Sequence, residues 1–85
     1  MDIGALFVHY FGTEDVESAA PETLQSGLEQ LRVDFGLEKD SGRRFGLWTL
    51  LYMFGAAPDI DVAFEDEEDR EAARDFMDAV DNADD

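Results

Sequence analysis

The side chain in this sequence best suited to acid–base or nucleophilic chemistry is His9, the only histidine. In nucleophilic sites an imidazole works beside a serine or cysteine whose proton it accepts. The chain contains no cysteine and no Gly-x-Ser-x-Gly motif that would present a serine. We therefore interpret His9 as a structural or surface residue, and we expect a non-enzymatic protein with no catalytic residue.

The acidic segment from Asp59 to Glu71 offers carboxylates, which are ligands that calcium prefers. An EF-hand loop needs oxygen ligands at its positions 1, 3 and 5, glycine at 6 and glutamate at 12. With Asp59 at position 1, positions 5, 6 and 12 fall on Ala63, Phe64 and Arg70, so the pattern fails at all three. We expect cations to gather here without a dedicated metal site, and no nucleotide-binding motif predicts a cofactor.

Basic side chains concentrate at one place only, where Ser41-Gly42-Arg43-Arg44 begins a predicted helix. Backbone N–H groups at a helix start and two guanidinium groups can together hold an anion, so Arg43 and Arg44 form a candidate anion site. The segment lacks the glycine-rich loop of phosphate sites. We favour the alternative in which both arginines pair with the carboxylates that surround them.

The charge of the chain is strongly one-sided: 22 residues are Asp or Glu and 6 are Lys or Arg, which gives a net charge of −16 over 85 residues. Repulsion among so many carboxylates opposes compaction unless salt or a cationic partner offsets it. A content of 45% hydrophobic and 12% aromatic residues excludes a disordered chain. Lys39 is the only lysine, and abundant acids with scarce lysine resemble the composition of proteins from cells that hold molar salt. We therefore expect adaptation to a halophilic-type cytoplasm.

The same charge distribution bears on nucleic acids. Binding DNA or RNA requires clustered Lys and Arg, and the basic residues here are few and scattered, so we expect no direct nucleic-acid binding. Mimicry of nucleic acid is the opposite case, because residues 65–82 hold 9 acidic residues in 18. This density is about one carboxylate per 3 Å of helix, close to the spacing of phosphates along one strand. Salt adaptation explains the scarcity of lysine, which mimicry does not require.

Hydrophobic periodicity and turn signals divide the chain into four predicted helices, which span residues 2–11, 21–35, 41–54 and 65–81. The first segment also contains the aromatic and β-branched residues of a strand, so we favour a helix there and leave the strand open. Residues 59–64 alternate polar and apolar side chains, which predicts an extended connector or a short strand. We expect an all-α single domain over residues 1–81, with an acidic tail at residues 82–85 that frays.

The third predicted helix has no polar face after Arg44. A helix that is apolar all round must be buried on every side, and three short neighbours in a chain of this length have difficulty covering it. We expect a homodimer with a shared core, or a protein partner, to complete the burial. The candidate interface consists of Phe45, Trp48, Leu51, Tyr52 and Phe54.

Two further features bear on location and role. The N-terminal segment carries Asp2 where a signal peptide has basic residues. The longest apolar stretch, residues 45–57, is shorter than the roughly 20 residues that span a bilayer. We expect a cytoplasmic protein without membrane contact.

The predicted function is a small acidic protein-interaction or regulatory module. The alternative is an inhibitor that mimics nucleic acid and binds a DNA- or RNA-binding protein.

Overall fold

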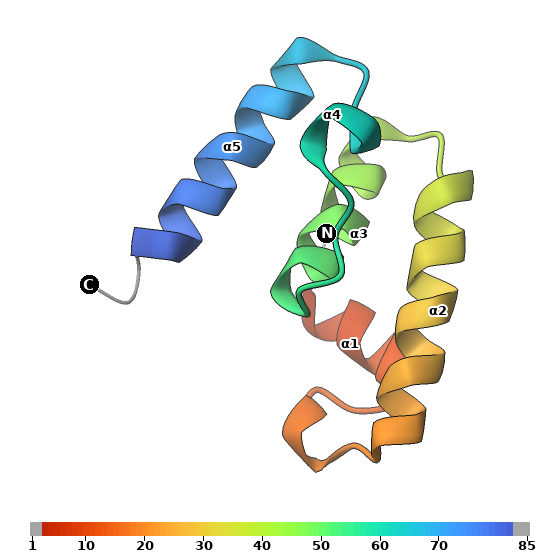
Figure 1. Cartoon of the computed structure of the whole chain (residues 1–85). Helices are drawn as coiled ribbons and strands as arrows, with labels where there is room; N and C mark the ends of the chain where they lie inside the picture. Colours follow the sequence, from red (N-terminus) through yellow and green to blue (C-terminus); the bar gives the residue numbers. More distant parts are fainter. Residues whose placement is uncertain (1–2, 83–85) are drawn as a thin grey trace.

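The computed structural model describes residues 3–82, and these residues form an all-α fold without a strand (Figure 1). They build five α-helices and one 3-10 turn: α1 (Ile3–Phe11), η1 (Val16–Ser18), α2 (Pro21–Leu37), α3 (Ser41–Met53), α4 (Ile60–Ala63) and α5 (Glu67–Asn82). The all-α prediction is confirmed. None of the helices in this part of the chain has the length and apolar character needed to cross a membrane.

The segment 59–64 differs from the prediction, because it forms a helical turn and not an extended connector. The backbone carbonyl of Asp59 accepts hydrogen bonds from the N–H groups of Val62 (3.0 Å) and Ala63 (2.8 Å). This turn places Ala63 and Phe64 in the core, while Val62 stays 76% exposed. The described residues therefore contain a fifth helix where the sequence predicts four.

The limits of the other predicted helices shift by a few residues. Helix α2 begins at the predicted Pro21 but continues through Gly36 to Leu37. Helix α5 begins at Glu67, inside the predicted segment, and runs one residue past it to Asn82. Residue 2 and residues 83–85 of the predicted tail lie outside the described residues.

The two ends of α3 follow from local sequence. Asp40 caps the N-terminus, where its Oδ2 atom accepts a hydrogen bond from the backbone N–H of Arg43 at 2.9 Å. At the other end Gly55 adopts a φ of 71°, which favours glycine. The N–H of Ala56 then donates to the carbonyl of Leu51 at 2.9 Å, as in a Schellman motif. These caps fix where the apolar helix starts and where the chain turns back.

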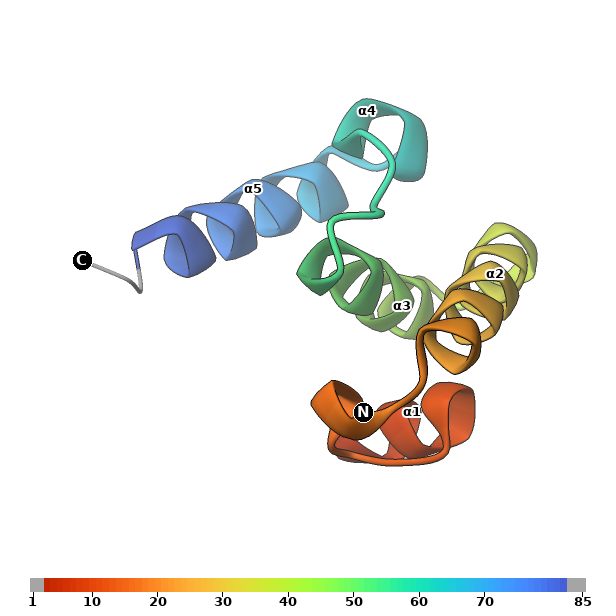
Figure 2. The same ribbon diagram turned by 60° about the horizontal axis from the view of Figure 1, so that its bottom comes forward.

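Helix α3 lies at the centre of the fold, with α1 and α2 on one side and α5 on the other (Figure 1, Figure 2). The segment 54–59 turns back along α3 and leads to α4 (Figure 1). Residues 47–51 of α3 are all buried, and none is more than 9% exposed. The neighbouring elements supply the remaining buried apolar side chains, which are Leu6, Phe11, Leu31, Phe35, Ala63, Phe64 and Ala73. The chain itself therefore covers most of its apolar third helix.

Helices α1 and α2 approach each other closely at Gly27, which is buried. A Cβ atom at this position would lie 2.4 Å from Cδ1 of Phe11 and 2.6 Å from the backbone oxygen of Tyr10. The Phe11 ring is only 2% exposed and is packed on all sides, so it has little room to move away. Glycine is therefore required for this helix contact.

Replacing Gly27 by alanine is expected to destabilise the fold by about 1–3 kcal/mol, because Phe11 and the backbone of α1 must shift. Gly36→Ala in the same helix is the matched control, since a Cβ atom there meets nothing within 4 Å. Alanine at position 36 should stabilise the protein by about 0.5–1 kcal/mol through its higher helix propensity. Urea denaturation of both variants measures the difference, and equal stabilities would contradict the close contact between α1 and α2.

Candidate functional site

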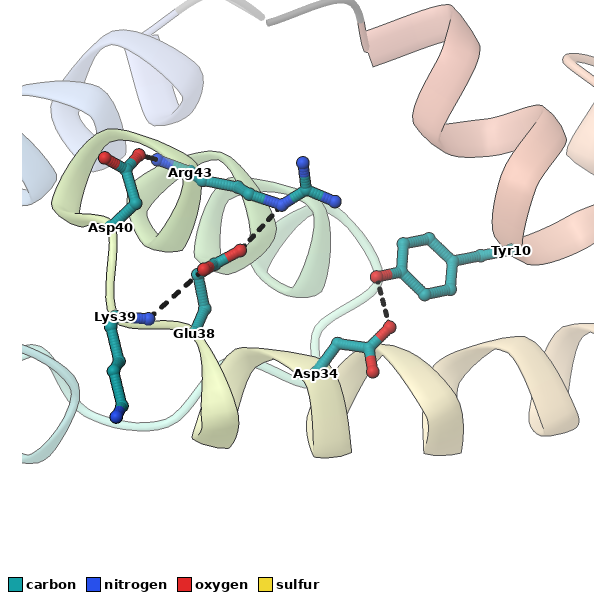
Figure 3. Close-up of polar contacts among 6 residues, drawn as sticks. All are labelled: Tyr10, Asp34, Glu38, Lys39, Asp40 and Arg43. Carbon is teal, nitrogen blue, oxygen red and sulfur yellow. Dashed lines mark hydrogen bonds and ion pairs between the residues drawn. The ribbon is translucent and has the colours of Figure 1, made fainter.

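A polar network joins α1, α2 and the start of α3 (Figure 3). The hydroxyl of Tyr10 donates a hydrogen bond to Oδ2 of Asp34 at 2.6 Å, and Nε2 of Gln30 donates to Oδ1 of the same carboxylate at 2.9 Å. Close by, Nε of Arg43 forms an ion pair with Oε1 of Glu38 at 2.6 Å. Four of these side chains, Tyr10, Asp34, Glu38 and Arg43, line an open hollow of about 310 Å³, which makes the hollow a candidate site for chemistry.

The electrostatics of this network oppose acid–base catalysis. Burial and the hydrogen bond to Asp34 raise the pKa of Tyr10 well above its ordinary value of 10.0. The hydrogen bond from Tyr10 holds the pKa of Asp34 below its ordinary value of 3.8. At neutral pH Tyr10 therefore stays protonated and Asp34 stays ionised, whereas a general acid or base needs a pKa near the working pH. The network is suited to holding α1 against α2.

The two arginines of the candidate anion site have different partners. Arg43 holds the ion pair described above. The guanidinium carbon of Arg44 lies 4.3 Å from the ring centroid of Phe35 and 5.9 Å from that of Phe64, and its Nη1 donates to the backbone carbonyl of Ala63. The two side chains line different hollows. Arg43 is thus used in an ion pair and Arg44 in packing, and the structure does not bring them together around one anion position.

The five candidate interface residues of the third helix do not form one surface. Trp48 and Leu51 are 1% and 0% exposed, so their own chain covers them. The other three are half-buried and face different neighbours. Phe45 packs beside the end of α4, Phe54 packs against α1, and Tyr52 packs against α5. Of the five, Tyr52 lies at the boundary between α3 and α5, where the surface is hollowed.

This hollow, which we call the α3–α5 groove, encloses about 410 Å³. The Nε1–H of Trp48 donates to the backbone carbonyl of Pro58 at 3.2 Å and holds the returning segment against α3. The ring of Tyr52 stacks on Trp48, with centroids 5.4 Å apart and planes inclined by 19°. The volume falls in the range of about 300–1,000 Å³ that is usual for ligand sites. The apolar and aromatic walls consist of Trp48, Tyr52, Ala57, Pro58, Ile60 and Met77.

The charged groups of the groove are all acidic. Asp59 and Asp61 complete its lining, and both are exposed. Beside it, the hydroxyl of Tyr52 donates to Oδ1 of Asp81 at 3.4 Å. Desolvation and the negative charge of Asp81 raise the pKa of Tyr52, so this hydroxyl stays protonated at neutral pH. The groove therefore combines an apolar floor with a negative rim and holds no basic side chain of its own.

Other candidate chemistry finds no support in the geometry. Among residues 4–82, no three His, Asp or Glu side chains lie together in a way that could hold a metal ion. His9 is exposed on α1, and its ring meets Tyr10 edge-on with centroids 4.7 Å apart. No known protein family, curated protein or solved structure matches this chain. The candidate site therefore rests on its geometry alone.

Sequence analysis identifies the aromatic part of the groove but misses the residues that complete it. Trp48 and Tyr52 belong to the predicted interface, whereas the sequence predicts an extended connector or a short strand for the segment that contains Asp59 and Asp61. Met77 lies within the last predicted helix and belongs to none of the predicted sites. The one local signal in the sequence for the groove is that Asp59 and Asp61 lie on either side of an apolar residue, Ile60. Their proximity to Met77 depends on how α5 packs, for which the sequence carries no local pattern.

Replacing Tyr10 by phenylalanine is expected to lower the free energy of unfolding by about 1 kcal/mol at neutral pH, because a partly exposed hydrogen bond to a carboxylate is lost. The folded-state pKa of Asp34 is depressed, so this contribution is present above pH ~4 and is lost as the pH falls further. The folded-state pKa of Tyr10 is raised, so the contribution is also lost as the pH rises beyond ~10. Urea denaturation of the wild type and Tyr10→Phe, from below pH ~4 to above pH ~10, measures the difference in their free energies of unfolding.

Tyr52→Phe is the matched control, because its hydroxyl contact with Asp81 is longer, at 3.4 Å, and exposed. We expect this variant to lose less stability than Tyr10→Phe. A Tyr10→Phe variant as stable as the wild type at neutral pH would contradict a stabilising role for the network. A difference in the free energy of unfolding between the wild type and Tyr10→Phe that does not shrink in acid would contradict it as well.

Proposed function

We propose that this chain is a non-enzymatic protein-interaction module that works in a salt-rich cytoplasm and binds a partner along the α3–α5 groove. The observation that carries the proposal is the incomplete cover of the apolar side of α5. Ala73 is 0% exposed, Phe76 and Met77 are half-buried, and Val80 is 40% exposed. The apolar side chains of α5 therefore become more exposed from Ala73 to Val80, and this apolar side extends beyond the groove onto the surface.

Phe76, Met77 and Asp81 connect the C-terminal half of α5 to the rest of the fold. The ring of Phe76 meets Trp48 and Tyr52 edge-on, with centroids 6.2 and 5.8 Å apart, and Asp81 accepts the hydrogen bond from Tyr52. A partner that covers the remaining apolar surface would gain about 25 cal/mol for each Å² buried. Apolar patches rimmed by polar residues mark interaction sites in soluble proteins. The α3–α5 groove with the adjoining face of α5 has this character.

The partner we propose is a different protein, and a second copy of the chain is the alternative. The sequence predicts a homodimer because α3 needs to be buried, but residues 47–51 are already buried in one chain. A second copy also brings its own net charge of −16, which opposes association. Sedimentation in molar KCl, where this repulsion is screened, separates the two cases: the mass of one chain supports a different partner, and twice that mass identifies a second copy.

The salt-rich solvent is supported by the lack of compensating cations. Among residues 3–82, the cations that form ion pairs are Arg43, Arg70 and Arg74, whereas 19 of the 22 acidic residues of the sequence lie in the same range. Most carboxylates in this range therefore repel one another without a cationic partner. At about 1 M salt the Debye length falls to about 3 Å, which removes most of this repulsion.

The free energy of unfolding is expected to rise between 0.1 M and 2 M KCl by at least about 1 kcal/mol, or roughly 4–8 °C in Tm. The physical reason is that salt screens repulsion among exposed carboxylates of the folded chain. A triple variant, Glu68→Gln with Glu71→Gln and Asp75→Asn, removes three exposed charges of α5 and should show a smaller rise. Calorimetry across KCl concentrations measures both. A wild type equally stable at low and molar salt would contradict adaptation to a salt-rich solvent.

Site-specific photo-crosslinking tests the proposed interaction surface. With benzoylphenylalanine in place of Val80, irradiation of the cells that make the protein should give a covalent adduct with a different protein. The same amino acid in place of Ser26, which is exposed on α2 and does not line the groove, should give no adduct. An adduct at both positions, at neither, or only between two copies of the chain would contradict the proposal.

Nucleic-acid mimicry is a second candidate, and the exposure of the acidic side of α5 favours it. A decoy of this kind competes with DNA for a basic DNA-binding protein, and its competition weakens steeply with salt. Binding through the apolar walls of the groove persists in molar KCl, because burial of apolar surface is not screened. Competition titrations at low and molar salt therefore separate the two functions. The exposed carboxylates concerned are Glu68, Glu71, Asp75, Asp78 and Asp81.

A further inference from the structure

The α3–α5 groove differs in its charge balance from the other large hollow of the described residues. That hollow encloses about 510 Å³ and contains three carboxylates, but Lys39 and Arg44 line it as well. The α3–α5 groove contains the carboxylates of Asp59 and Asp61 and no Lys, Arg or His. One hollow thus supplies its own cations, whereas the groove lacks them.

We propose that the groove binds a lysine or arginine side chain from a basic segment of a protein partner, an inference that rests on the proposed function. The carboxylates of Asp59 and Asp61 form no hydrogen bond or ion pair with the rest of the described chain, so both can accept hydrogen bonds from the cationic head of such a side chain. Ile60 and Met77, in the apolar wall, pack against its methylene stem. Long basic side chains combine these two properties, an apolar stem and a charged tip.

The charge of the surroundings selects this occupant over a second copy of the chain. Residues 59–85 carry 13 acidic residues against 2 basic ones, a net charge of −11. The two basic residues, Arg70 and Arg74, already lie 3.7 and 3.5 Å from carboxylate oxygens of Glu67. A second α5 helix would therefore place like charges opposite one another, while a basic segment offsets them and is steered toward the groove.

The test compares two synthetic helical peptides that differ only in charge. Both consist of leucine, alanine and glutamine, and one carries two arginines where the other carries two citrullines, which have the same shape without the charge. Trp48 lines the groove and is the only tryptophan of the chain, so its fluorescence reports binding of these tryptophan-free peptides. For the wild type we expect the arginine peptide to bind about tenfold more tightly, as one or two charge-assisted hydrogen bonds imply.

A double variant, Asp59→Asn with Asp61→Asn, removes the two charges and keeps the size and polarity of the side chains. It should lose most of this preference and bind both peptides with similar affinity. The control, Glu17→Gln with Glu22→Gln, makes the same change in net charge at exposed positions that do not line the groove, and it should keep the tenfold preference. The Trp48 emission of each free variant confirms that its core is intact.

Each of the remaining outcomes contradicts the binding of a basic side chain in the groove, and each has a separate consequence for the proposed interaction function. Equal binding of both peptides to the wild type, abolished by Met77→Asp, would show that the groove docks a partner through apolar contacts alone. The interaction function would then stand without the basic occupant. A tenfold preference that survives in the Asp59 and Asp61 double variant, or is lost in the control, would place the charge recognition elsewhere. Binding of neither peptide would exclude the basic occupant, while crosslinking through Val80 decides the interaction function independently.

Discussion

The fold depends on the need to cover α3 from every side. Residues 47–51 are consecutive and all buried, and five residues exceed one helical turn, so this central stretch of the helix faces water on no side. Cover comes from α1 and α2, from the segment 54–59 with α4, and from α5. The polar groups inside are satisfied: Thr49 Oγ1 donates to the carbonyl of Phe45 at 3.0 Å, and no buried side-chain polar atom of the described residues lacks a partner.

The same constraint shapes the surface on which the proposed function rests. Helix α5 completes the cover of α3 with Ala73 and Phe76, and the rest of its apolar side extends beyond the core toward Val80. The outer side of the helix is left to carboxylates, because the acidic chain has few other side chains to place in water. Where the cover ends, apolar walls and an acidic rim therefore meet in the α3–α5 groove. This combination suits the binding of a cationic partner better than acid–base chemistry.

Local signals predict the helices better than they predict how the helices meet. Pro21 and Asp40 mark the starts of α2 and α3, because a missing N–H group and a capping carboxylate act within one turn. The extent to which one chain can cover α3 is not local, since it depends on the return of segment 54–59, which Trp48 helps to hold. The groove cannot be predicted from local signals either, because Met77 lines it only when α5 packs against α3. The period of a six-residue stretch is also too short to separate a strand from a helical turn.

Trp48, the only tryptophan of the chain, is 1% exposed, and the chain alone supplies this cover. The most direct measurement is the fluorescence of Trp48 in molar KCl, with the neutral quencher acrylamide, as the protein is diluted from micromolar to nanomolar concentration. The structure predicts emission at short wavelength and strong protection from acrylamide at every concentration. Emission that moves to longer wavelength and becomes quenchable on dilution would show that a second copy supplies the cover, and would contradict this account.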